Sequence, residues 1–123
     1  MSLLLDTNAL IWWLEGALSG EAAAAINHPD EIVVVSAVSV WEVSIKTALG
    51  KLRSPGDLPL AIVEEGFEPL SISIDHAHAA GGLPRHHADP FDRLLIAQAQ
   101  LEGLTIVTRD RAFDAYEVDV LAC

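Results

Sequence analysis

The stretch Leu3-Leu4-Leu5-Asp6-Thr7-Asn8 changes abruptly from apolar to polar residues near the start of the chain. A short leucine run followed by helix-capping residues predicts a buried strand that leads directly into a helix. This strand would deliver Asp6 to its carboxyl end. Ile32-Val33-Val34-Val35 consists only of β-branched residues and stops at Ser36, which predicts a second strand buried on both faces.

Strands and helices alternate along the rest of the sequence. We expect further strands at 70–74, 105–108 and 118–121, and helices at 9–14, 21–26, 39–49, 58–65, 75–82, 91–101 and 111–116. This alternation predicts an α/β fold: a three-layer sandwich with a central, mostly parallel sheet flanked by helices. With 123 residues, positions 1–123 are expected to form a single domain.

Three helix starts are predicted from capping residues. Ser39 has the spacing of a capping box with Glu42 three residues later. Asp75 is expected to cap the helix that reaches residue 82. Asp89-Pro90 combines an N-cap residue with proline at the first helical position.

The composition is that of a globular protein, because 51% of the residues are hydrophobic and 20% are charged. The apolar runs are far shorter than the roughly 20 residues needed to cross a bilayer, and no basic, apolar leader precedes Asp6. We therefore expect a cytoplasmic protein without membrane contact. The single cysteine, Cys123, excludes an intramolecular disulfide and a thiolate metal cluster.

The formal net charge of −11 argues against nucleic-acid binding, because phosphates repel carboxylates. If several carboxylates converge on divalent cations, the local charge becomes positive, since the bound ions are then the largest local charges. Such a site could bind phosphates. The placement of the acids therefore decides which classes of function remain open.

Three acids are predicted at one edge of the sheet. Asp6 follows the first strand, Asp110 follows the strand at 105–108, and Glu42 lies near the start of the helix after the second strand. Ligands of open α/β sheets bind at this edge. Asp89 and Asp92 lie three residues apart on one further helix. Carboxylates that share a small site need a cation between them, and oxygen ligands suit Mg²⁺ or Mn²⁺.

Each acid also has a structural interpretation. Asp6 and Asp89 could be N-caps only, Glu42 a capping-box partner and Asp110 a turn residue. Capping does not explain why four acids converge, but it explains Asp89 well because Pro90 follows. The pair His86-His87 lacks thiolate partners and a third histidine, so we expect loop surface or a phosphate contact rather than a metal ligand.

Four strings resemble the signature blocks of PIN-domain ribonucleases of the VapC type, the toxins of type II toxin–antitoxin systems. They occur in the order of that family and span nearly the whole chain. Together they are a specific signal of the family, whereas Asp-Thr-Asn alone would be weak evidence. The strings are Leu4-Leu5-Asp6-Thr7-Asn8-Ala9-Leu10, Ser36-Ala37-Val38-Ser39-Val40-Trp41-Glu42-Val43, Asp89-Pro90-Phe91-Asp92-Arg93-Leu94-Leu95-Ile96-Ala97-Gln98-Ala99 and Val107-Thr108-Arg109-Asp110.

The resemblance implies an acidic Mg²⁺ site, in which Mn²⁺ could substitute, with Thr7 lending its hydroxyl. Asp92 matches the third acid of the family because it precedes the Leu-Leu-Ile-Ala run, although the neighbouring Asp89 leaves this assignment open. The implied catalytic metal ligands are Asp6, Glu42, Asp92 and Asp110.

The function implied is a magnesium-dependent endoribonuclease that hydrolyses RNA phosphodiester bonds with metal-activated water. Arg93 or Arg109 would hold the substrate phosphate. The resemblance further implies a structured or ribosome-associated RNA as substrate, a VapB-like antitoxin that blocks the site, and a homodimer.

Three alternatives remain. A phosphohydrolase with Asp6 as nucleophile needs a second aspartate two residues later, where Asn8 stands. A phospho-accepting receiver domain needs an aspartate ending its central strand and a lysine after a late strand, and the sequence supplies no convincing pair. A catalytically inactive PIN-like module that binds RNA or protein ranks low, because all four acids are present.

Overall fold

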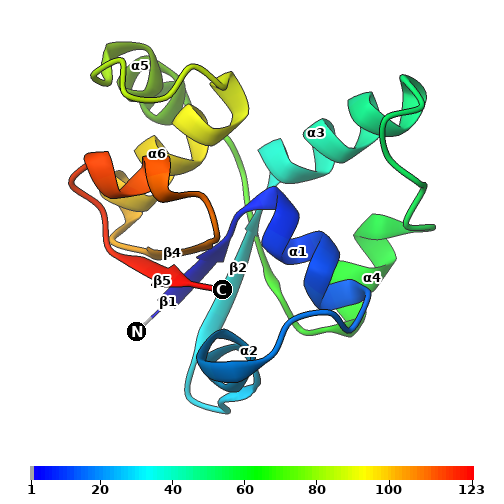
Figure 1. The fold of residues 1–123 in the computed structure, drawn as a ribbon. Coiled ribbons are helices and arrows are strands. Elements are labelled where there is room, and N and C mark those ends of the chain that lie inside the picture. The colour runs from blue at the N-terminus through cyan, green and yellow to red at the C-terminus, as the bar shows by residue number, and fades with distance from the viewer. Residues whose placement is uncertain (1) are drawn as a thin grey trace.

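Five parallel strands form the centre of the computed structural model, which describes residues 2–123. Their order in the sheet is β3-β2-β1-β4-β5, with helices on both faces (Figure 1). The predicted α/β architecture with a central parallel sheet is confirmed. The strands are β1 (Ser2–Leu5), β2 (Ile32–Ser36), β3 (Glu68–Leu70), β4 (Thr105–Thr108) and β5 (Val120–Ala122).

Six α-helices and one 3-10 helix connect the strands. They are α1 (Thr7–Leu14), α2 (Gly20–Asn27), α3 (Ala37–Ala48), α4 (Leu58–Glu64), α5 (Ile74–Gly82), α6 (Pro90–Glu102) and η1 (Arg111–Ala115). As predicted, α6 begins after the N-cap Asp89, and Gly103 ends it in a left-handed conformation. None of the helices within residues 2–123 has the length and apolar character needed to cross a membrane.

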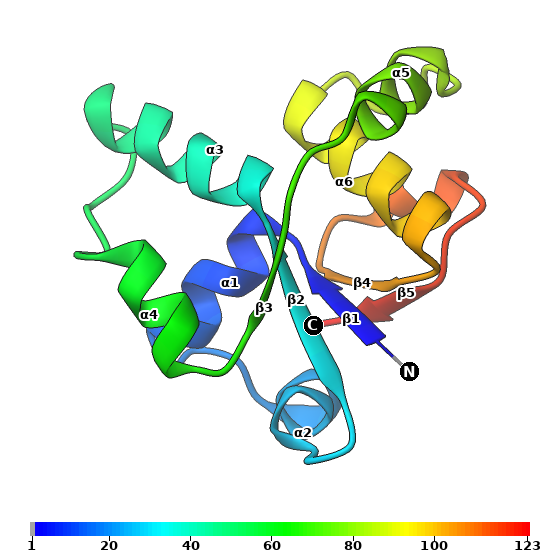
Figure 2. The same cartoon turned by 180° about the vertical axis from the view of Figure 1, so that it is seen from behind.

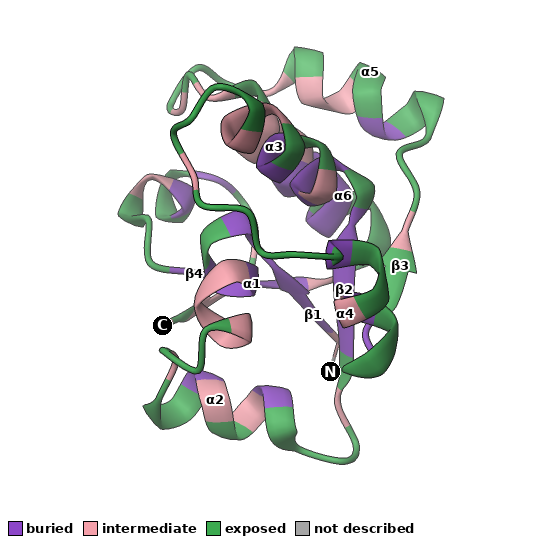
Figure 3. Cartoon of the chain, turned by 90° about the vertical axis from the view of Figure 1, so that its right-hand side faces the viewer, coloured by how far each residue is buried: buried purple, intermediate pink, exposed green. Residues whose placement is uncertain are grey.

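The sheet is buried on both faces because successive strand residues point in opposite directions. On β1, Leu3 and Leu5 pack with α1, α2 and α4, whereas Leu4 packs with α6 and η1. Figure 3 shows the buried residues along the strands and on the inner faces of α3 and α6. The leucine run that opens the sequence thus contributes to two hydrophobic cores.

The strand order reverses beside β1. The chain forms β1, β2 and β3 on one side and then, through α5 and α6, crosses to β4 and β5 on the other side. Figure 2 shows β3 at one edge of the sheet and α5 beside α6. Because Leu5 is in register with Val107, the carboxyl ends of β1 and β4 meet. In open α/β sheets, ligands bind beside such a reversal of strand order.

The predicted start of α3 is wrong. The helix begins at Ala37, and its N-cap is Ser36, whose hydroxyl accepts a hydrogen bond from the Val38 amide at 3.1 Å. Ser39 and Glu42 therefore lie inside the helix and do not form a capping box. The reason is that Ser36 serves both as the last residue of β2 and as the cap, so that no loop separates strand from helix.

Two strands and one cap also differ from expectation. The strand predicted at 70–74 ends at Leu70, because Ser73 begins α5 through a capping box with His76. Asp75 therefore lies in the first turn of α5 and is not its cap. The last strand, predicted at 118–121, is Val120–Ala122 and pairs with β4.

Candidate metal site

Asp6 is buried and directly follows β1, at the carboxyl edge of the sheet. Its Oδ1 accepts the Ala9 amide at 2.7 Å, so that it is the N-cap of α1 as well as a candidate ligand. Burial raises the pKa of Asp6, and the negative charges of Glu42 and Asp110 raise it further; hydrogen bonds from the Thr108 hydroxyl and the Ala9 amide oppose this shift. Asp6 therefore shares a low-dielectric site with other acids.

Glu42 reaches the same site from α3 and is buried. Its Oε1 accepts the hydroxyl of Thr7 at 2.7 Å, and its Oε2 pairs with the Lys46 ammonium one helical turn later. Thr7 lies next to Asp6 in the sequence. The contact with Thr7 therefore ties α3 to the start of α1 and keeps the Glu42 carboxylate near the end of β1.

Asp89 and Asp92 differ in their surroundings. Asp89 Oδ1 accepts the amides of Phe91 at 2.8 Å and Asp92 at 3.2 Å, which makes it the cap of α6. Asp92 lies in the first turn, where burial and then the charges of Asp89, Glu42 and Asp6 raise its pKa to about 7, with His87 acting in the opposite direction. Asp92 therefore interacts electrostatically with Glu42 and Asp6, whereas the Asp89 carboxylate is engaged in capping α6.

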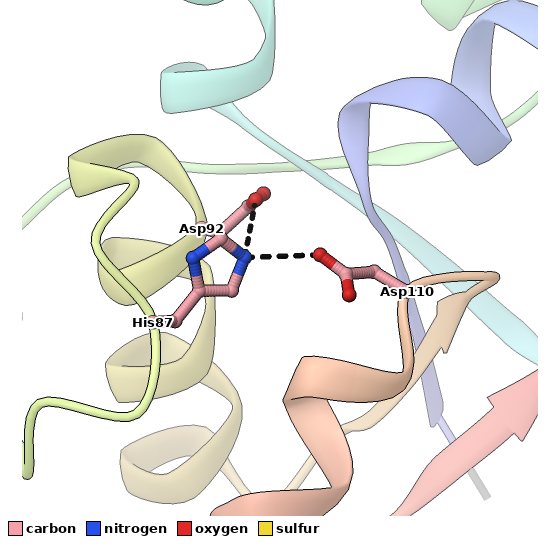
Figure 4. Close-up of side chains that lie close together, drawn as sticks. All are labelled: His87, Asp92 and Asp110. Carbon is pink, nitrogen blue, oxygen red and sulfur yellow. Dashed lines mark hydrogen bonds and ion pairs between the residues drawn. The ribbon is translucent and has the colours of Figure 1, made fainter.

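Asp110 follows β4 and caps η1 by accepting the Ala112 amide at 2.9 Å with Oδ1. Its Oδ2 lies 3.0 Å from His87 Nε2, and the same nitrogen lies 3.0 Å from Asp92 Oδ2. Figure 4 shows the His87 imidazole between the two carboxylates. Asp110 is the most open of these residues, with 45% of its side chain exposed.

The structure brings the four predicted acids to one edge of the sheet, and it adds His87, which the sequence placed on the loop surface or at a phosphate. One feature of the sequence could have indicated a role for His87 at the site: it lies two residues before Asp89, the cap of the helix that carries Asp92. Spacing alone could not show that the ring also reaches the end of β4.

The two arginines predicted to contact substrate lie in different environments. Arg93 donates through Nη1 and Nη2 to four backbone carbonyls, those of Ala80, Leu83, Pro84 and His87. Arg109 is exposed. Its guanidinium lies 4.0 Å from the centroid of the Trp12 ring, and its Nε donates to the carbonyl of Cys123 at 3.0 Å.

The donor set fits a divalent cation. Carboxylate oxygens are the ligands that Mg²⁺ and Mn²⁺ prefer. The raised pKa values of Asp6 and Asp92 reflect burial and mutual repulsion, both of which a cation would offset. Among the described residues, His87, Asp92 and Asp110 form the group whose potential ligand atoms all lie within 4.8 Å of one another. Asp6 and Glu42 add their negative charges to the same site.

Comparisons with known proteins identify relatives of this chain by sequence and by fold. The PIN domain family model matches residues 3–119. Ribonuclease VapC22 of Mycobacterium tuberculosis is 33% identical, over 89% of this chain and 88% of the relative. Among solved structures, VapBC2 of Rickettsia felis bound to a promoter DNA fragment superposes with a TM-score of 0.73 at 17% identity, covering 99% of this chain and 98% of that one. A toxin-antitoxin complex from Klebsiella pneumoniae gives a TM-score of 0.68 at 22% identity, covering 97% and 95%.

Proposed function

The chain belongs to the PIN-domain family, and we propose that it is a metal-dependent endoribonuclease that hydrolyses RNA phosphodiester bonds. The observation that carries the proposal is the convergence of Asp6, Glu42 and Asp92 at the point where the strand order of the sheet reverses. The name of the 33% identical relative, a ribonuclease, supports the same activity.

The proposed ligands of the cation, Mg²⁺ or Mn²⁺, are the carboxylates of Asp6, Glu42, Asp92 and Asp110. When bound, the cation would activate water and offset the negative charge that develops on the phosphate. The protein's own contribution is to hold the oxygens in place before metal and substrate arrive. The Ala9 amide does this for Asp6, and the Thr7 hydroxyl does it for Glu42.

Substrate contact is proposed for Arg109, which is exposed and lies next to Asp110. Stacking on Trp12 holds its guanidinium at the carboxyl end of β4. For Arg93 we propose a structural role instead, because both of its Nη atoms already donate to backbone carbonyls.

We further propose that the protein is the toxin of a type II toxin–antitoxin pair. A VapB-like antitoxin would then cover the site, as the likeness to the toxin-antitoxin complex from Klebsiella pneumoniae suggests. Exposed apolar side chains on α3 and α4, among them Trp41 and Val63, offer surface for such a partner.

A structured RNA substrate and a homodimer are also proposed. Size-exclusion chromatography with light scattering would test the homodimer.

Cleavage of total RNA by the purified protein tests the proposed activity. We expect cutting with Mg²⁺ that EDTA abolishes and that Asp6→Asn reduces at least about a hundredfold. Asn can still accept the Ala9 amide, so the cap of α1 is retained. The matched control is Asp30→Asn, an exposed residue between α2 and β2, which should cut like the wild type. Full cutting by Asp6→Asn would refute the proposal.

A further inference from the structure

The His87 ring has a defined tautomer. Its Nδ1 lies 3.1 Å from the backbone nitrogen of Asp89, and a backbone amide can only donate. Nδ1 therefore accepts and carries no proton, which places the ring proton on Nε2. The Nε2–H group donates a hydrogen bond to Asp110 Oδ2 at 3.0 Å, and Asp92 Oδ2 lies at the same distance from Nε2 (Figure 4).

The loop that carries His87 is held on several sides. The Tyr116 hydroxyl accepts the His87 amide at 2.8 Å and donates to the carbonyl of Pro84 at 2.7 Å. Arg93 Nη1 donates to the His87 carbonyl at 3.3 Å. The imidazole packs edge-on against Phe113, with 5.7 Å between ring centroids, and only 14% of the side chain is exposed. The direction of the Nε2–H group is thus set by the fold and not by chance rotation at the surface.

We propose that His87 is a positioning residue of the acidic site, a role that rests on the proposed function. Its Nε2–H contacts Asp92 on α6 and Asp110 after β4, and so orients two carboxylates that come from different elements of the fold. A protonated nitrogen has no lone pair for a metal, so this tautomer makes His87 a donor to the ligands and not itself a ligand. Such donors fix the orientation of metal-binding side chains.

Two substitutions separate the contacts of the ring. In His87→Asn, the amide oxygen takes the place of Nδ1 and can accept the Asp89 amide, but the side chain is too short to reach the two carboxylates. In His87→Gln, the amide nitrogen takes the place of Nε2 and can still donate to them. The pair therefore distinguishes the bridge to Asp92 and Asp110 from the contribution of the ring to loop stability.

Calorimetric titration of the full chain with Mn²⁺ is the principal experiment. We expect His87→Asn to weaken Mn²⁺ binding about tenfold or more and His87→Gln to stay within about threefold of the wild type. The Mg²⁺ concentration for half-maximal RNA cleavage should shift in the same order. In the wild type, long-range ¹H–¹⁵N NMR should show the proton of His87 on Nε2 both before and after Mg²⁺ is added.

Three outcomes would overturn the inference. Wild-type Mn²⁺ affinity in His87→Asn would show that the bridge positions nothing. Equal losses in both variants, with the Nε2 proton lost when Mg²⁺ is added, would identify His87 as a ligand. A wild-type protein that neither binds Mn²⁺ nor cuts RNA would refute the proposed function together with this inference, whereas the first two outcomes leave that function standing.

Discussion

The Thr7 hydroxyl oxygen lies 2.7 Å from Glu42 Oε1, across 35 residues of sequence and in a buried position. The Thr7 hydroxyl has one proton, and it donates this proton to Glu42 Oε1, the shorter of its two contacts. The Ser39 hydroxyl, 3.1 Å from the Thr7 oxygen, can then donate to Thr7. This chain of hydroxyls orients Glu42 from α3 toward the end of β1.

Thr7→Val removes the hydroxyl and keeps the shape of the side chain. We expect the free energy of unfolding to fall by about 1–3 kcal/mol, because a buried carboxylate loses a donor. Mn²⁺ affinity should fall as well, since Glu42 is no longer oriented. Urea unfolding and calorimetry measure the two effects. Thr7→Ser keeps the hydroxyl and should retain both properties; equal losses in the two variants would show that the methyl group matters instead.

Asp92 predicts a pH dependence of stability in metal-free protein. Its pKa rises from 3.8 to about 7 on folding, so between these values the folded state binds more protons than the unfolded state. The contribution of Asp92 to stability is therefore full below about pH 4 and is lost as the pH rises through 7. Mg²⁺ should restore stability at high pH, because a cation favours the ionised carboxylate.

Asp92→Asn should remove this dependence. Above pH 7 we expect the variant to be more stable than the wild type by about 1–2 kcal/mol, a value that allows for solvent screening at this partly exposed group. Near pH 4 the two proteins should be equally stable. Urea unfolding in EDTA across this pH range is the measurement, and Asp30→Asn serves as control. Parallel curves for Asp92→Asn and the wild type would contradict the assignment.

Lys46 pairs with Glu42, a proposed ligand of the cation, and we expect its ammonium to compete with the metal for this carboxylate. The hydrogen bond with Glu42 raises the pKa of Lys46, and the charges of Glu42, Asp89 and Asp92 add to this, against a smaller lowering by burial. Lys46→Met keeps most of the aliphatic stem and removes the charge. We expect Mn²⁺ to bind about threefold more tightly in calorimetry. Stability should change by less than about 1 kcal/mol, because 41% of the Lys46 side chain is exposed.

The matched control for Lys46 is Lys51→Met, an exposed residue just beyond α3, which should leave Mn²⁺ affinity unchanged. Weaker binding in Lys46→Met would mean that the ammonium orients Glu42 rather than competing for it.

Arg93→Lys tests the structural role proposed for this arginine. A lysine cannot reproduce the planar fork that donates to four carbonyls, so we expect a loss of about 2–3 kcal/mol in unfolding free energy and faster proteolysis within residues 83–89. Arg85→Lys, at an exposed position of the same loop, should change neither property. Unchanged stability combined with weaker RNA binding would instead support the substrate contact predicted from the sequence.

Local patterns in the sequence were sufficient for much of the fold. The leucine run before Asp6 and the β-branched run before Ser36 predicted β1 and β2, because strands buried on both faces need continuous apolar residues. Asp89-Pro90 and Gly103 predicted the ends of α6, because capping depends on a few neighbouring residues. The ends of the predicted strands also placed Asp6 and Asp110 at the carboxyl edge of the sheet, because each acid follows a strand.

The tertiary structure alone decided the contacts between distant segments. His87 contacts Asp110 across 23 residues of sequence. Arg93 donates hydrogen bonds to carbonyls of the loop at 83–89, for which the sequence predicted no helix or strand. Ser36 rather than Ser39 caps α3 because the pairing of β2 determines where that strand ends. A hydrogen bond depends on the distance and angle between two groups, and for residues far apart in the chain packing determines both. The sequence shows the apolar periodicity that drives packing, but not the distances and angles that result.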